Sequence, residues 1–125
     1  LIQIATGIEL PCEARIGNRF RIDHFGGIIV SGYASFGDHC VIRQGVTVGL
    51  KNVESPAGPT IGNHVDIGAG AKVLGAINIG DHVDVGANAV VISDIPPHSI
   101  AVGIPARIIP KRDQLPETKP PAHEH

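Results

Sequence analysis

The sequence predicts an all-β fold, a parallel β-helix built from hexapeptide repeats. Three observations support this: aliphatic residues recur every six positions, glycine is abundant and aromatic residues are scarce. The 125 residues, 42% hydrophobic and 18% charged, suffice for one domain with its own core. Glycine contributes 16 residues, well above a usual share of about 7%, whereas aromatic residues make up only 3%. This composition fits a narrow core of similar layers filled by Ile, Val, Leu and Ala.

The six-residue period runs through the chain in three phases. A helix repeats its apolar residues every three or four positions and a strand every two, so a period of six indicates a short strand plus a corner. Three such sides make one coil of 18 residues, and stacked coils pair as parallel strands about 4.8 Å apart. The phases hold Ile4, Leu10, Ile16 and Ile22; Val30, Phe36, Ile42 and Val48; and Ile61, Ile67, Val73, Ile79, Val85 and Val91.

Two insertions interrupt the repeat. Two extra residues fall within residues 25–27, and seven fall between Val48 and Ile61. The longer insertion, residues 50–60, predicts a protruding loop, and loops on a rigid scaffold commonly carry function. We expect the pattern to end after Val91, with residues 102–109 as a short terminal segment. Residues 1–109 are therefore predicted to form the β-helix, and residues 110–125 a flexible C-terminal tail.

Charge and cysteine content exclude several classes of function. The net charge is −2 and there is no basic stripe, so nucleic acid is not an expected partner. No apolar run approaches the roughly 18 residues of a membrane span, and no signal peptide is visible. Two cysteines, Cys12 and Cys40, are too few for a disulfide framework, and Cys40 occupies an inward position. A reducing, cytoplasmic setting is expected.

Histidines are the main candidates for chemistry. His39, His64 and His82 share the fourth position of their units, so the coil register predicts a column along one edge. We interpret this column as solvated corner residues rather than a metal or proton ladder, because carboxylate and Cys partners are missing at ligand spacing. His98 is interpreted as a turn residue. His24 directly precedes the first insertion, where the backbone leaves the regular coil. Two interpretations of His24 stay open, a general base and a corner residue.

Five segments of the chain together resemble serine O-acetyltransferases. The IDH, QGVT and VGIPAR motifs are the specific part, whereas the repeat alone indicates only the wider hexapeptide acyltransferase superfamily. The resemblance implies a left-handed parallel β-helix, acetyl-CoA as co-substrate, no metal, and a homotrimer with active sites between neighbouring prisms. The segments are residues 6–10 (TGIEL), 21–32 (RIDHFGGIIVSG), 43–49 (RQGVTVG), 67–91 (IGAGAKVLGAINIGDHVDVGANAVV) and 96–109 (PPHSIAVGIPARII).

The resemblance also implies roles for single residues. His24 is the implied general base, which takes the proton of the acceptor hydroxyl while that oxygen attacks the thioester. Glu9 is the implied acid that orients the imidazole, and Asp23 helps to hold the acceptor. The residues implied to line the coenzyme A cleft are Gly49, Ala69 and Ala87, and those implied to meet its phosphates are Arg107, Lys111 and Arg112.

The sequence leaves the chemical class of the acceptor undecided. Family members carry Arg-His-Pro at the end of the loop, where the Arg and His bind the serine carboxylate, but this chain has Ala57-Gly58-Pro59. Pro11 stands where the family has a histidine, and the family's N-terminal helical domain is not among these residues. The leading hypothesis is an acetyl-CoA-dependent O-acetyltransferase acting on serine or another hydroxyl compound.

Three alternatives accompany this hypothesis. The first is a sugar or polysaccharide hydroxyl as the acceptor. The second, of another class, is a non-catalytic β-helix scaffold, which need not retain Glu9, Asp23 and His24 together. The third is a metal-dependent β-helix of the carbonic anhydrase kind, which the single-edge histidine column disfavours because such a site needs histidines facing between subunits.

Overall fold

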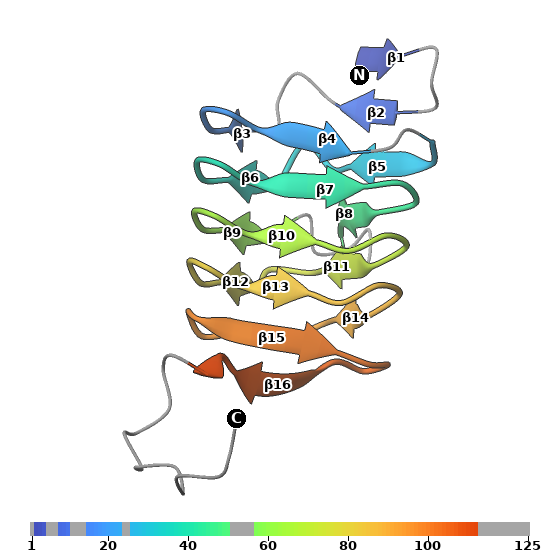
Figure 1. Ribbon diagram of the computed structural model, residues 1–125. Coiled ribbons are helices and arrows are strands. Elements are labelled where there is room, and N and C mark those ends of the chain that lie inside the picture. The colour runs from blue at the N-terminus through green and yellow to red at the C-terminus, as the bar shows by residue number, and fades with distance from the viewer. Residues whose placement is uncertain (1, 5–7, 11–14, 24–25, 51–56, 113–125) are drawn as a thin grey trace, which may run out of the picture.

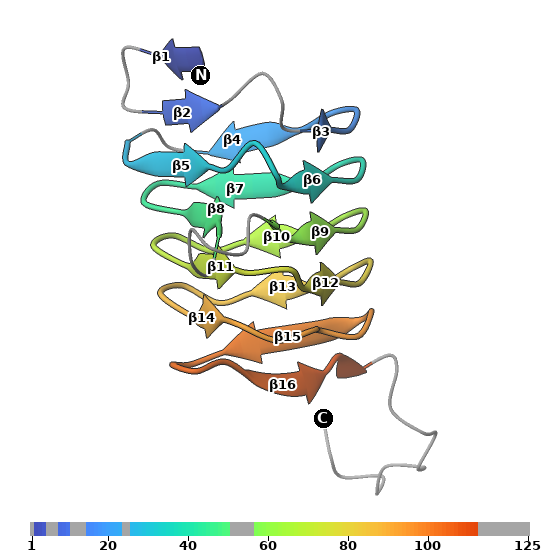
Figure 2. The same ribbon diagram turned by 180° about the vertical axis from the view of Figure 1, so that it is seen from behind.

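Each repeat unit folds as a short strand followed by a corner, and successive strands turn onto three different sheets (Figures 1 and 2). The computed structural model describes residues 2–4, 8–10, 15–23, 26–50 and 57–112, with the backbone alone for residues 2–4 and 8–10. Within these residues, no helix is long and apolar enough to cross a membrane.

The three sheets form the sides of the coil stack. Their strands pair in parallel, except for the antiparallel pairs β1–β2 and β15–β16. Sheet A contains β1 (Ile2–Ile4), β2 (Ile8–Leu10), β5 (Ile28–Val30), β8 (Thr47–Gly49), β11 (Lys72–Leu74) and β14 (Val90–Val91). Sheet B contains β3 (Arg15–Ile16), β6 (Ser35–Phe36), β9 (Thr60–Ile61) and β12 (Asn78–Ile79). Sheet C contains β4 (Arg21–Asp23), β7 (Val41–Arg43), β10 (Asp66–Ile67), β13 (Asp84–Val85), β15 (Ser99–Val102) and β16 (Arg107–Pro110).

The coil is left-handed. In Figure 1 the parallel strands of sheet C run from left to right across the front while the coils descend. In Figure 2, seen from behind, strands of sheets A and B such as β5 and β6 also run from left to right. Viewed from the N-terminal end, the chain therefore turns anticlockwise as it recedes. This is the exception to the right-handed crossover usual between parallel strands, and it confirms the predicted fold class.

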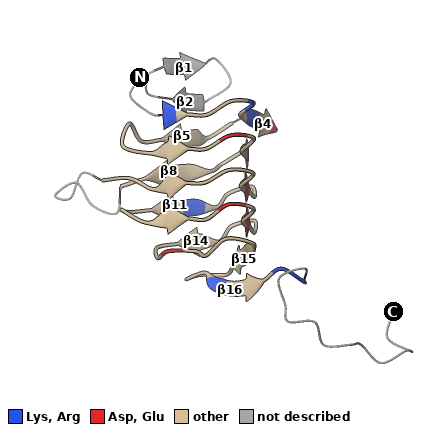
Figure 3. Cartoon of the chain, turned by 90° about the vertical axis from the view of Figure 1, so that its left-hand side faces the viewer, with Lys and Arg blue, Asp and Glu red and all other residues tan. Residues whose placement is uncertain are grey.

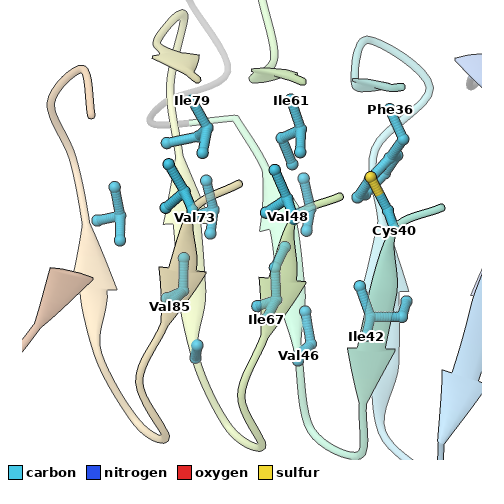
Figure 4. Packing of buried hydrophobic residues seen from close by; sticks show 14 of the residues in the cluster. Phe36, Cys40, Ile42, Val46, Val48, Ile61, Ile67, Val73, Ile79 and Val85 are labelled. Atoms are coloured by element: carbon cyan, nitrogen blue, oxygen red, sulfur yellow. The ribbon is translucent and has the colours of Figure 1, made fainter. Parts of the chain in front are cut away.

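The aliphatic residues of the repeat fill the interior. From Val30 to Val91, every residue at the predicted inward position is at most 5% exposed. Figure 4 shows them stacked in rows, with Phe36, Ile61 and Ile79 in one row and Ile42, Ile67 and Val85 in another. Each such side chain gains about 1.5–3 kcal/mol from burial. Ile16 is 37% exposed because β3 is the edge strand of sheet B.

After each insertion the chain returns to the register of the coil. After the first, Ile28 fills the inward position beside Val46, and its side chain is fully buried. After the second, Pro59 is buried beside Ala34, and its carbonyl accepts a hydrogen bond from the Ser35 amide at 3.0 Å. Residues 51–56, the middle of the predicted loop, lie outside the described residues.

The expectation that the repeat ends after Val91 is wrong. The next inward residue is Ile95, four positions later instead of six, and it pairs with Ile79 of the preceding coil. Ala101 follows six positions later beside Val85, and both new inward residues are buried. A two-residue deletion thus hides two further sides of the coil, and the β15–β16 hairpin closes the second of them. Residues 113–125, most of the predicted tail, lie outside the described residues.

Candidate active site

The turns between sheets C and A form one corner of the stack, at residues 44–45, 69–70 and 87–88, here called the C–A corner. It holds Ala69 and Ala87, both predicted to line a coenzyme A cleft, one coil apart. The Asn88 amide donates to the Ala69 carbonyl at 2.8 Å. A Cβ atom at Gly68 would lie 2.7 Å from the Ala87 nitrogen, so glycine is what lets the coils approach here. Ala87 is exposed, which leaves backbone groups of this corner accessible.

Asp23 and Arg107 mark the two ends of the sheet C edge that leads to this corner. Asp23 ends β4, and Arg107 begins β16 opposite Val102. Five strand spacings separate β4 from β16 in sheet C, which amounts to about 24 Å. Gly49 lies elsewhere, buried at the end of β8 on sheet A, where its carbonyl accepts from the Gly75 amide at 2.9 Å.

The two residues predicted to act on the proton fall in or beside the undescribed segments. His24 lies outside the described residues, between β4 and β5 in the chain. Glu9 belongs to β2, for which only the backbone is described, and pairs in register with Ile29 of β5. Their roles therefore stay predictions.

The Asp23 carboxylate lies between two guanidinium groups. Arg21 approaches with Nε 2.9 Å from Oδ1 and donates from Nη2 to Oδ2 at 3.0 Å. Arg43, its cross-strand neighbour on β7, places Nη2 3.9 Å from Oδ2. Arg43 also makes a two-point contact with Asp66 of β10, from Nη1 to Oδ1 and from Nη2 to Oδ2. This hydrogen bonding raises the pKa of Arg43 above its ordinary value, against the lowering effect of burial.

A longer column of charges continues along sheet C. Figure 3 shows acidic segments one above another along the side of the stack that carries sheet C, with basic segments at β4 and after β16. Asp84 stands beside Asp66 in register, and Lys111 reaches the Asp84 carboxylate at 3.2 Å. The Lys111 amide donates to the His98 carbonyl, so Lys111 lies at the opposite end of β16 from Arg107. The structure thus separates these two predicted phosphate contacts.

The predicted histidine column is confirmed, and His98 extends it. The rings of His39, His64, His82 and His98 stack with centroids 4.7, 4.7 and 5.0 Å apart and interplanar angles of 2°, 5° and 11°. They occupy the corner at the other edge of sheet C, where it meets sheet B. Parallel rings one coil apart do not converge on one point. Among the described residues, no group of three or more His, Cys, Asp or Glu side chains is placed to hold a metal ion.

Sequence reasoning missed Arg21, Arg43 and Asp66. A signal for two of them was present, because Asp23 and Arg43 are 20 residues apart, one coil plus the two-residue insertion. Adding the seven-residue insertion to the next coil likewise brings Asp66 beside the strand of Arg43. The direction of each side chain was not readable from the spacing.

Comparison with known proteins shows which proteins the chain as a whole is similar to. No model of a known protein family matches the chain. The chain is 46% identical over 110 residues to serine acetyltransferase of Synechococcus elongatus and 47% identical over 112 residues to that of Helicobacter pylori. These matches cover 87% and 89% of this chain, but 45% and 66% of the two relatives. The chain therefore spans less than half the length of the first of these relatives.

Solved structures of similar fold are also serine acetyltransferases. Serine acetyltransferase of Neisseria gonorrhoeae in complex with serine is 39% identical, with a TM-score of 0.76, over 81% of this chain and 42% of that one. Serine acetyltransferase of Brucella abortus in complex with coenzyme A is 38% identical, also with a TM-score of 0.76, over 79% of this chain and 40% of that one.

Proposed function

Because this chain belongs to the family of serine acetyltransferase-like hexapeptide-repeat proteins, we propose that it transfers the acetyl group of acetyl-CoA to a hydroxyl acceptor. The observation that carries the proposal is the similarity of nearly the whole described body to serine acetyltransferases. The Asp23 end of sheet C and the exposed backbone at Ala87 add a site of suitable extent.

The proposed reaction needs one base and no metal. His24 takes the proton of the acceptor hydroxyl while that oxygen attacks the thioester carbonyl of acetyl-CoA. The resulting tetrahedral intermediate collapses by breaking the carbon–sulfur bond, and the proton passes from His24 to the departing thiolate. Glu9 orients the imidazole and stabilises its protonated form. Asp23, next to His24 in the chain, holds a polar group of the acceptor.

Coenzyme A is proposed to lie along the stack beside the C–A corner. It is an extended molecule, and the roughly 24 Å from β4 to β16 is a length that it can span. Backbone groups at Ala69 and Ala87 are proposed to meet its arm, and Arg107 to meet a phosphate, whereas the role of Gly49, buried at the far end of β8, rests on the resemblance alone. Lys111 can add a second cation only by leaving Asp84.

Serine is the first acceptor to test, since the similar proteins are serine acetyltransferases. One observation favours a sugar hydroxyl instead. Ala57 and Gly58 stand where the family has Arg and His, and a Cβ atom at Gly58 would lie 2.7 Å from the Tyr33 carbonyl carbon. The packing around Gly58 thus leaves little room there for a long side chain that could bind the carboxylate of serine.

We also propose a homotrimer located in the cytoplasm. The trimer follows from the family resemblance, in which neighbouring prisms share each active site, and light scattering should return three times the 13.0 kDa chain mass. The location rests on cysteine use, since Cys40 is a free, buried thiol of the kind that reducing compartments keep.

The decisive experiment measures release of free coenzyme A from acetyl-CoA with a panel of hydroxyl acceptors that includes L-serine and D-glucose. We expect turnover with at least one acceptor, and His24→Ala should lower kcat about 10²- to 10⁴-fold. His82→Asn, at the corner between sheets B and C, is the matched control and should keep full turnover.

Two results would refute the acetyltransferase assignment. One is wild-type turnover in the His24→Ala protein. The other is a melting temperature that saturating coenzyme A leaves unchanged, because a ligand at about 100 times its Kd stabilises the native state by about 2.7 kcal/mol. The second result would favour the non-catalytic scaffold.

A further inference from the structure

Asp23 is held by two arginines of very different exposure. The Arg21 side chain is 65% exposed, whereas that of Arg43 is 29% exposed. An exposed ion pair contributes little, and its long side chain moves away at small cost. Arg21 therefore occupies the outer side of the Asp23 carboxylate as an exchangeable partner, and Arg43 stays behind it.

Arg43 is itself anchored, because Asp66 binds both of its terminal nitrogens. A two-point contact between guanidinium and carboxylate fixes the plane of the arginine as well as its position. Asp23, Arg43 and Asp66 come from β4, β7 and β10, adjacent strands of sheet C, so the three groups form a row across the sheet. One end of this row is Asp66, and the other is Asp23, which is next to His24 in the chain.

We propose that Arg43 is a positioning residue, which holds the Asp23 carboxylate for the acceptor while Asp66 holds Arg43. The inference rests on the proposed function, in which Asp23 binds the acceptor. Arg43 lies 3.9 Å from Oδ2 of Asp23, and the acceptor displaces Arg21, whose Nε lies 2.9 Å from Oδ1 and whose Nη2 lies 3.0 Å from Oδ2. The acceptor group that fits there is a hydrogen-bond donor, a hydroxyl or an amine.

Arginine is suited to this place and lysine is not. One guanidinium has enough donors in a fixed plane to contact two carboxylates at once, whereas an ammonium is a single point charge. Arg43→Lys keeps the charge and should still fail to orient Asp23. A purely electrostatic role would instead be rescued by lysine.

The test is steady-state kinetics of Arg43→Gln, Arg43→Lys, Asp66→Asn and Arg21→Gln, with L-serine as acceptor, or D-glucose if the wild type acetylates only the sugar. Arg43→Gln should raise the acceptor KM by up to about fivefold, the value of one partly exposed ion pair, and leave the KM for acetyl-CoA unchanged. Asp66→Asn should act in the same direction, and the double variant should lose no more than Arg43→Gln alone. Arg21→Gln should lower the acceptor KM, since it removes a competitor.

Arg15→Gln is the control for loss of a guanidinium, because Arg15 lies on sheet B. Melting temperatures of all variants separate positioning from unfolding. An active wild type whose acceptor KM is unchanged in Arg43→Gln overturns this inference alone, and so does full rescue by Arg43→Lys. A wild type inactive with every acceptor overturns the proposed function, and the inference with it.

Discussion

Cys40 occupies an inward position where other units carry valine or alanine, and its side chain is fully buried. Its Sγ lies 3.1 Å from the Gly62 carbonyl oxygen of the next coil, to which the thiol donates. Burial is the main cause that raises the pKa of the Cys40 thiol above its ordinary value of 9.0, and the Asp38 carboxylate adds to it. Cys40 is therefore a packing residue with an inert thiol, as its place in the repeat predicted.

The raised pKa of Cys40 makes stability depend on alkaline pH. The unfolded chain releases this thiol proton near pH 9, whereas the folded chain keeps it to higher pH. Above about pH 9 the unfolded state thus binds fewer protons, and the free energy of unfolding falls as pH rises through the folded pKa. Urea unfolding between pH 7 and 10.5 should record this fall in the wild type and a shallower one in Cys40→Ala. Parallel curves for the two proteins would contradict it, and Cys12→Ser is the control.

At the scale of single residues, the sequence predicted identities better than contacts. The motifs marked Asp23 and Ala87, and the structure places both on the same side of the stack, at the C–A end of sheet C. The motifs did not reveal that Asp23 lies between Arg21 and Arg43, because an ion pair depends on side-chain directions across neighbouring strands. The ion pair of Lys111 with Asp84 was missed for the same reason.

The corner between sheets B and C is an element that a short sequence motif specifies. Each residue of its triplets, such as Gly37-Asp38-His39 and Gly62-Asn63-His64, has a separate structural role. Glycine allows close approach, since a Cβ atom at Gly37 would lie 2.2 Å from Asn63 Oδ1. The side chain of Asn63 accepts from the Asp38 amide at 2.7 Å, which joins the coils. The third residue adopts a left-handed conformation, with φ of 60° at His39 and 55° at His64.

This backbone conformation predicts which substitutions the column tolerates. His64→Asn should preserve stability, because asparagine enters the left-handed region readily. His64→Val should cost about 1–2 kcal/mol, since a β-branched side chain is strained there. Guanidinium unfolding of the two variants measures the difference. If both lose stability equally, ring stacking and not backbone conformation determines the choice of histidine.

At the scale of the whole molecule, each coil contacts the coils above and below it, so stability accumulates along the stack. The C-terminal end is closed by β16, which pairs with all four residues of β15. Without this hairpin, β15 would be an exposed edge strand, which invites pairing with other chains.

Truncation separates the closing hairpin from the residues that follow it. A chain ending at Arg112 keeps β16 and should retain the wild-type melting temperature and trimer mass. A chain ending at Ala106 lacks β16 and should melt at lower temperature and aggregate. Calorimetry and light scattering of both proteins provide the measurement. A large loss of stability in the longer protein would show that residues 113–125 pack on the body, contrary to the predicted tail.

The sequence by itself determined the coil, the inward residues from Val30 to Val91, the histidine column and the family. These follow from a period of six, which assigns every side chain to a sheet and a face. Only the tertiary structure decided how the chain continues past Val91 and which charges meet on sheet C. The physical reason is that stacking joins residues a coil apart plus the length of any insertion or deletion. A change of register is visible in the sequence, but where the chain rejoins the stack depends on the packing of the coils on either side.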